Sequence, residues 1–121
     1  MAKKILIVED HLPTVEMMTE MFKMEEFEVA SASDGLEGLK KAESEKPDLI
    51  VLDVMMPYMD GIEVCKKLKE SSKTSKIPVI IVSVKAAEAD INTGKGSGAN
   101  DYVVKPFDPQ KLMEAVHKLI K

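Results

Sequence analysis

The sequence predicts an α/β protein with a doubly wound, five-stranded parallel sheet that helices cover on both faces. Short apolar runs alternate five times with stretches of helical periodicity, and this alternation is typical of right-handed β-α-β crossovers. Several of these runs contain no polar residue and are rich in β-branched side chains. Such runs indicate strands that are buried on both faces, as in a parallel sheet.

The five expected strands are short, and the central one is the clearest. Residues 49–53 begin just after Pro47 and end on a carboxylate, Asp53. The run over 28–33 is weaker and more polar, which predicts a place at a sheet edge. The full set of expected strands covers residues 4–8, 28–33, 49–53, 78–83 and 101–104.

Each expected strand is followed by a helical pattern. Asp34 and Asp108 precede two of these patterns and are typical N-cap residues. In the fourth pattern, Gly94 and Gly96 oppose a helix, because each glycine costs about 1 kcal/mol relative to alanine. We therefore expect this helix to end near residues 91–92 and to be the least stable. The expected helices cover about 13–24, 35–44, 62–70, 86–92 and 109–120.

Composition limits the function classes. The chain has 121 residues, of which 45% are hydrophobic, so one domain over 1–121 is expected. No run approaches the length of a membrane span or signal peptide, and the lone Cys65 fits a reducing cytoplasm. The net charge is −4, and all seventeen basic side chains are lysines. Because arginine is favoured for reading bases and phosphates, we expect no direct contact with nucleic acid.

Polar residues stand at four strand ends: Glu9 and Asp10, then Asp53, Ser83 and Lys105. These ends share one edge of a parallel sheet, where ligands usually bind. Three carboxylates in one pocket repel each other unless a cation intervenes. Oxygen ligands suit Mg²⁺, and a nearby lysine and hydroxyl suit a phosphoryl group, which a carboxylate can accept covalently.

These motifs resemble the receiver domains of two-component response regulators, and in particular the single-domain chemotaxis regulators. The resemblance spans nearly the whole chain and implies a flavodoxin-like α/β/α sandwich with strand order 2-1-3-4-5 and five helices. The matching segments are residues 5–10, 53–61, 79–83 and 98–107.

The resemblance also implies a role for each residue at the site. Asp53 would be the phosphoacceptor. Glu9, Asp10, Asp53 and the backbone carbonyl of Met55 would hold Mg²⁺. The chain would catalyse only its own phosphorylation and dephosphorylation, with phosphohistidine on a sensor histidine kinase or a phosphotransfer protein as the donor.

The remaining implied roles concern switching. Lys105 would pair with the phosphoryl group, Ser83 would bond to it and move, and Tyr102 would follow as the aromatic switch. The fourth helix, fifth strand and fifth helix would then act on a downstream effector or output domain. The resemblance is compatible with a monomer or a phosphorylation-dependent homodimer, and with a whole protein or an excised receiver. It also favours a cis Lys105–Pro106 bond.

Two residues depart from the family pattern. Val84 stands where the family usually has a very small residue, which affects access to the site and the lifetime of the phosphoryl group. Lys85 adds a second cation near the rim, and we expect it to be solvated.

Two other functions fit parts of the pattern. A haloacid-dehalogenase-like phosphatase also uses an aspartate after a parallel strand, but it needs a second acid where this chain has Met55. A receiver-like binding module that no longer accepts phosphate would not need the complete set of acids, hydroxyl and lysine. The glycine-rich stretch 94–99 is not a dinucleotide-binding loop, because it precedes a strand instead of following one.

Overall fold

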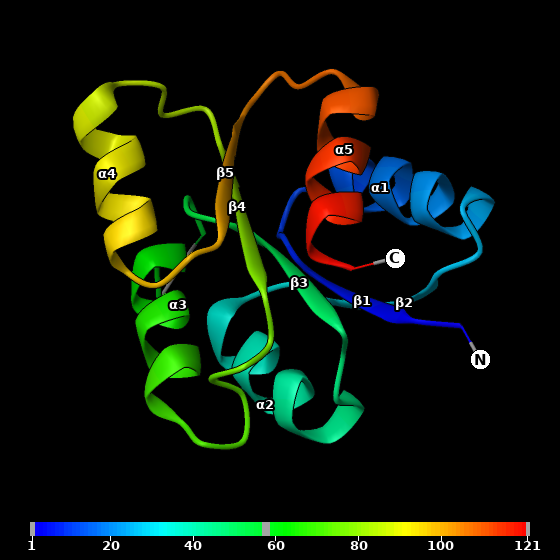
Figure 1. Ribbon diagram of the computed structural model, residues 1–121, viewed down its shortest axis with the longest axis horizontal. Helices are drawn as coiled ribbons and strands as arrows, with labels where there is room; N and C mark the ends of the chain where they lie inside the picture. The colour runs from blue at the N-terminus through cyan, green and yellow to red at the C-terminus, as the bar shows by residue number, and fades with distance from the viewer. Residues whose placement is uncertain (1, 57–58, 121) are drawn as a thin grey trace.

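The computed structural model describes residues 2–56 and 59–120. Strands and helices alternate along the chain (Figure 1). The strands are Lys4–Val8 (β1), Glu28–Ala32 (β2), Leu49–Asp53 (β3), Val79–Ser83 (β4) and Asp101–Val104 (β5). The helices are Leu12–Met24 (α1), Gly35–Glu45 (α2), Gly61–Glu70 (α3), Glu88–Gly96 (α4) and Pro109–Leu119 (α5).

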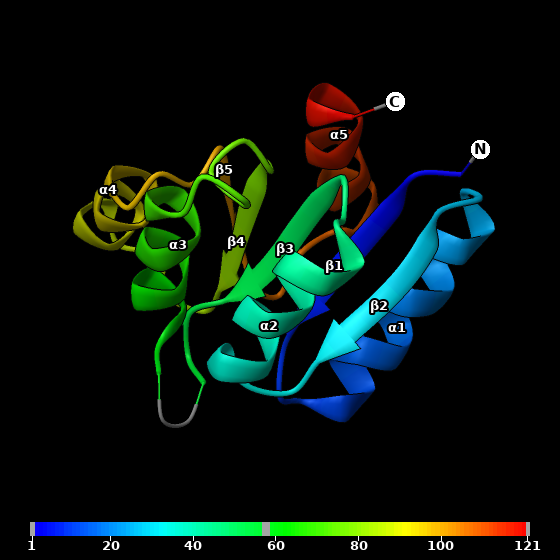
Figure 2. The ribbon, with the colours of Figure 1, turned by 90° about the horizontal axis from the view of Figure 1, so that it is seen from below.

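The five strands form one parallel sheet in the order β2-β1-β3-β4-β5, which confirms the predicted fold. The more polar β2 lies at one edge, as expected, and β5 lies at the other (Figure 2). All residues of β3 and β4 are buried, because these central strands have a neighbour on each side and helices on both faces.

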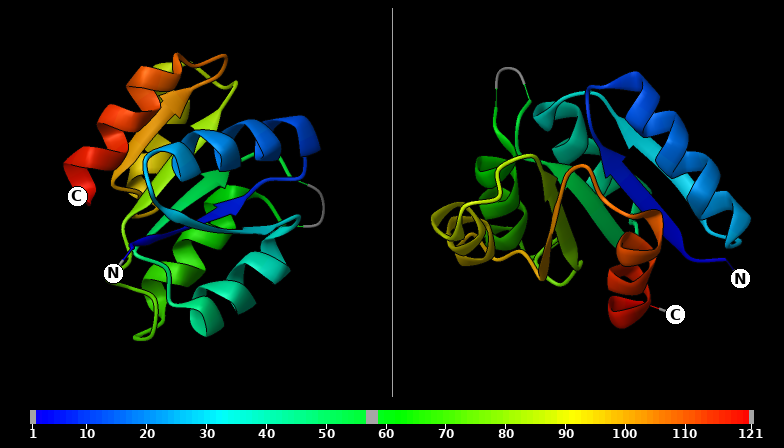
Figure 3. Two further views of the ribbon diagram at one scale, coloured as in Figure 1. Left: turned by 90° about the vertical axis from the view of Figure 1, so that its right-hand side faces the viewer. Right: turned by 90° about the horizontal axis from the view of Figure 1, so that it is seen from above.

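Alternate side chains of the strands point to opposite faces of the sheet and belong to two separate hydrophobic cores. On one face, Ile7 and Val51 pack with Phe22 of α1 and Val116 of α5. On the other face, strand residues such as Leu52 pack against α2 and α3. Figures 1 and 3 show α1 and α5 together on one side of the sheet. No helix in the described ranges is long and apolar enough to cross a membrane.

Side-chain caps fix where several helices begin. Asp34 accepts a hydrogen bond from the Glu37 N–H at the start of α2, as predicted. Asp60 does the same for Glu63 in α3, and Asp108 for Gln110 in α5. These caps hold the loops at the carboxyl ends of the strands, where the candidate site lies.

The predicted end of the fourth helix is wrong. The helix does not stop at residues 91–92 but runs from Glu88 to Gly96. Gly94 is buried within it, and the Ser97 N–H closes the last turn on the carbonyls of Thr93 and Gly94, at 3.1 and 3.2 Å. Packing and these bonds therefore outweigh the poor helix propensity of two glycines.

Candidate functional site

The strand register brings the predicted acids together. Val8 pairs with Leu52 in adjacent strands, so the residues that follow them, Glu9 and Asp53, stand at the same sheet edge. Both are buried, with exposed fractions of 2% and 5%, whereas Asp10 is exposed. Carboxylate oxygens of Glu9, Asp10 and Asp53 all lie within 4.8 Å of one another. This donor set fits a hard divalent cation.

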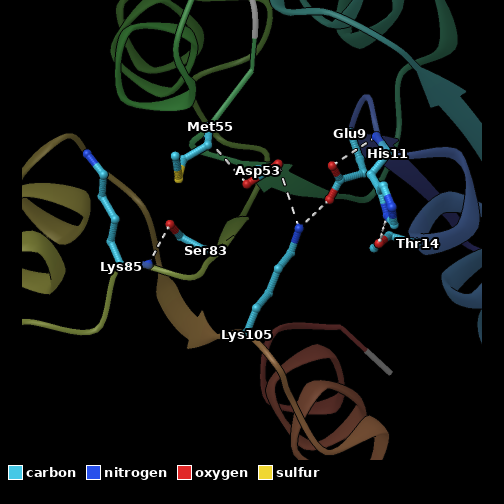
Figure 4. A network of polar contacts seen from close by, with 8 residues as sticks. All are labelled: Glu9, His11, Thr14, Asp53, Met55, Ser83, Lys85 and Lys105. Carbon is cyan, nitrogen blue, oxygen red and sulfur yellow. Dashed lines mark hydrogen bonds and ion pairs between the residues drawn. The ribbon is translucent and has the colours of Figure 1, made fainter.

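Lys105 reaches into this cluster from the end of β5. Its Nζ lies 2.6 Å from Glu9 Oε1 and 3.7 Å from Asp53 Oδ2 (Figure 4). The side chain is largely buried, so the pairs are poorly screened by solvent. The Lys105–Pro106 peptide bond is cis, as predicted. The lysine is thus placed beside both buried acids, although its shorter contact is to Glu9.

Ionisation differs between the two buried acids. Burial, followed by the neighbouring Glu9, raises the pKa of Asp53 from its ordinary value of 3.8 to about 7. Burial also disfavours the charged form of Glu9, but the hydrogen bonds from Lys105, Asp53 and the His11 N–H, with the charge of Lys105, together outweigh it, and the pKa of Glu9 is lowered. The His11 N–H adds a bond of 3.2 Å to Glu9 Oε2. Glu9 therefore carries the charge that pairs with Lys105, and Asp53 is poised to take up a proton near neutrality.

The backbone after β3 also contacts Asp53. The Met55 N–H lies 3.2 Å from Asp53 Oδ1, and the Met55 side chain is half exposed at the rim. A Cβ on Gly61 would overlap the Asp53 carbonyl and come within 2.7 Å of Val54 Cα. The Asp60-Gly61 pair in the sequence signals this close approach, a role for Gly61 that was not predicted. Pro57 and Tyr58 of the same motif lie outside the described residues.

Ser83 and Tyr102 are linked through the backbone of Lys85, a connection that was not predicted. Ser83 is fully buried at the end of β4, and its Oγ accepts a hydrogen bond of 3.1 Å from the Lys85 N–H (Figure 4). The Lys85 carbonyl accepts one of 2.8 Å from the Tyr102 hydroxyl. Lys85 is exposed, as expected, but its peptide groups join the two predicted switch residues. No sequence pattern signals such a backbone bridge.

The side chain of Ser83 stands apart from the acid cluster. The backbone N–H of Lys105 donates to the Ser83 carbonyl at 2.7 Å, but across the described ranges no hydrogen bond or ion pair joins the Ser83 side chain to the side chain of Asp53 or Lys105. Val84 is 59% exposed, so its bulk lies on the surface beside this end of β4. The structure thus has two groups at one sheet edge: the acids with Lys105, and Ser83 with Lys85 and Tyr102.

A comparison with known families decides between the remaining functions. Residues 5–117 match the model of the response regulator receiver domain. The chain belongs to this family. Receivers are signalling domains of two-component systems, so the phosphatase alternative is set aside. The predicted family and its general role in phosphorelay signalling are confirmed.

Curated relatives and solved structures agree with this assignment. The chain is 44% identical over 121 residues to the alkaline phosphatase synthesis transcriptional regulatory protein PhoP of Bacillus subtilis, covering all of this chain and 50% of PhoP. It is 36% identical over 121 residues to the DNA-binding response regulator MtrA of Mycolicibacterium paratuberculosis, covering all of this chain and 52% of MtrA. The receiver therefore spans about half the length of these relatives.

Two solved structures have nearly the same fold. Vibrio cholerae chemotaxis protein CheY4 gives a TM-score of 0.93 at 30% identity, over 99% of this chain and 100% of CheY4. The receiver domain of sensor histidine kinase PA1611 from Pseudomonas aeruginosa gives 0.91 at 25% identity, over 99% of this chain and 98% of that one. The PA1611 structure has a magnesium ion coordinated in its active site cleft.

Proposed function

We propose that this receiver accepts a phosphoryl group on Asp53 from a phosphohistidine of a sensor histidine kinase or phosphotransfer protein. The observation that carries this proposal is the arrangement at the sheet edge: three carboxylates within 4.8 Å, with a lysine 2.6 Å from one and 3.7 Å from another. In the transfer, an Asp53 oxygen forms a bond to phosphorus and the N–P bond of the donor breaks. The imidazole nitrogen keeps the electron pair, and the product is an acyl phosphate.

Each residue of the site has a proposed part in this transfer. Asp53 must be ionised to attack, and the Met55 N–H orients its Oδ1. The Lys105 ammonium group, now paired with Glu9, would also contact and stabilise the incoming phosphoryl oxygens. Glu9, Asp10, Asp53 and the Met55 carbonyl are the proposed ligands of Mg²⁺. When bound, Mg²⁺ would neutralise the acids and the arriving phosphoryl charge.

The output of the domain is also proposed. Residues 1–121 would act as one receiver that controls a downstream effector or output domain through α4, β5 and α5. Ser83 would move toward the phosphoryl group and, through the Lys85 backbone, change the position of Tyr102. MtrA is described as DNA-binding, but this chain matches only about half of it. We propose that this receiver, whose basic residues are all lysines, makes no nucleic-acid contact of its own.

Phosphorylation by a small donor tests the proposal. Incubation with acetyl phosphate and Mg²⁺, followed by intact mass, should show one added phosphoryl group, and a chelator should prevent the addition. Rapid hydrolysis of the donor without accumulation would favour a phosphatase, and no addition would favour a binding module. Asp53→Asn should show no addition. Asp48→Asn is its matched control, because Asp48 lies just before the opposite end of β3 and accepts a hydrogen bond from the Lys4 N–H at 2.8 Å.

Mg²⁺ binding should depend on pH. The pKa of Asp53 is about 7 without metal, and a ligand carboxylate must lose its proton. The apparent Mg²⁺ affinity should therefore rise about tenfold per pH unit below 7 and level off above pH 8. Titration calorimetry in buffers of different ionisation enthalpy will measure the affinity and the released proton. An affinity that is equal at pH 6 and pH 8 would contradict this assignment.

Helix α4 should exchange its amide hydrogens first. Gly94 is its only buried residue, so few apolar contacts oppose local opening. Hydrogen exchange should show residues 86–98 opening before the other four helices, with altered rates after phosphorylation. Protection equal to that of α5 and unchanged by phosphate would be evidence against this view.

A further inference from the structure

Helix α4 has a glycine at the point where it meets the ring of Tyr102. Gly94 is buried, and a Cβ built on it would lie 2.7 Å from both Cδ2 and Cε2 of Tyr102. It would also lie 3.3 Å from Ile81 Cδ1. Cδ2 and Cε2 are bonded atoms of one rigid ring, so they cannot move out of the way separately, as the end of a flexible side chain could. Any side chain at this position must therefore displace the whole ring or the helix.

The same ring is fixed at its other end. The Tyr102 hydroxyl donates to the Lys85 carbonyl at 2.8 Å, and the Lys85 N–H donates to Ser83 Oγ at 3.1 Å. Tyr102 is half-buried in the face of the sheet that α4 covers. Its position thus depends on space at Gly94 and on a hydrogen bond at Lys85.

We infer that Gly94 is a positioning residue, whose missing side chain keeps Tyr102 in the position where it contacts Lys85. A methyl group at 94 would push the ring away from α4 and break its hydrogen bond to the Lys85 carbonyl. The indirect connection from α4 through Tyr102 and Lys85 to Ser83 would then be lost. The consequence for signalling rests on the proposed function, whereas the packing relation between Gly94 and Tyr102 does not.

Gly96 supplies a matched control in the same helix. It is exposed, and a Cβ there would have no neighbour within 4 Å. By helix propensity alone, Gly96→Ala should raise the folding equilibrium constant about fivefold. Gly94→Ala has the same gain in propensity, but we expect it to lower that constant at least tenfold because of the clash with the ring.

A double-mutant cycle in urea separates the ring from other causes. In a Tyr102→Ala background, Gly94→Ala should lose most of its penalty and approach the behaviour of Gly96→Ala. This rescue is measurable even if Gly94→Ala alone does not fold. The inference would be overturned if, in the parent background, Gly94→Ala changed the folding equilibrium constant as Gly96→Ala does. It would also be overturned if the penalty of Gly94→Ala persisted without the Tyr102 ring.

A second readout tests positioning rather than stability. Tyr102 is one of two tyrosines in the chain, so ring signals in an NMR spectrum of tyrosine-labelled protein are simple to assign. Gly94→Ala should move the Tyr102 signals and reduce their change on phosphorylation, while Gly96→Ala should do neither. Unmoved Tyr102 signals in Gly94→Ala would refute the positioning role. If the parent accepts no phosphoryl group, the proposed function fails, but the cycle still tests the packing.

Discussion

Asp53→Asn should make the metal-free protein more stable at pH 8 while abolishing phosphorylation. The pKa of Asp53 lies above its ordinary value of 3.8, at about 7. A raised carboxyl pKa means that the folded state disfavours the charge, so this group lowers stability as the pH rises from about 4 through 7. The neutral amide removes both the cost of burying this charge and its repulsion from Glu9, and we expect a gain of roughly 2 kcal/mol at pH 8.

Denaturant unfolding at several pH values will measure this gain. The difference between Asp53→Asn and the parent should shrink toward pH 4 and also shrink when Mg²⁺ is added to the parent. Asp48→Asn, at the other end of the strand, should stay within about 0.5 kcal/mol of the parent. A loss of stability in Asp53→Asn at pH 8 would show that Asp53 is not the strained acid of the site.

Lys105→Met should lower the stability of the protein, which is the opposite of the effect expected for Asp53→Asn. Lys105 Nζ lies 2.6 Å from the buried Glu9, and removing one partner of a buried pair leaves an uncompensated charge. The lowered pKa of Glu9 depends largely on Lys105, so this pKa should rise in the variant. We expect a loss of about 3 kcal/mol at pH 8, and a smaller loss at pH 5, where the acids can take up protons.

A surface lysine provides the control for Lys105→Met. Lys40 is exposed on α2, and Lys40→Met should change the free energy of unfolding by about 0.5 kcal/mol or less. Phosphorylation of Lys105→Met by acetyl phosphate should be slow even under conditions in which the variant is folded. A penalty that does not depend on pH would point to lost packing of the lysine stem rather than lost charge.

The sequence predicts most of the fold because its strongest signals are local and agree with one another. The buried run ending on Asp53 becomes the central strand β3, and the more polar run over 28–33 becomes the edge strand β2. The strand order that the family resemblance implies then makes β1 and β3 neighbours and places Glu9 beside Asp53. Caps such as Asp34 are equally local and appear where expected.

The features that the sequence did not predict depend on contacts between distant segments. Helix α4 continues through Gly94 because that glycine packs against Tyr102, which lies on another element. The bridge from Ser83 to Tyr102 uses backbone atoms of Lys85, and side-chain identity carries no information about it. Likewise, Lys105 pairs more closely with Glu9 than with Asp53, a choice set by the geometry of the strand ends.

We propose that Asp53 is the phosphoacceptor of a site formed by the strand ends, and chemical mapping of the modified residue tests this role most directly. Borohydride reduces an aspartyl phosphate to homoserine, which peptide mass spectrometry can locate. After treatment with acetyl phosphate and Mg²⁺, homoserine should be found at position 53 and at no other acid, and omission of Mg²⁺ should abolish it. Homoserine at Asp10 or Asp60, or an unmodified Asp53 in folded protein, would contradict the claim.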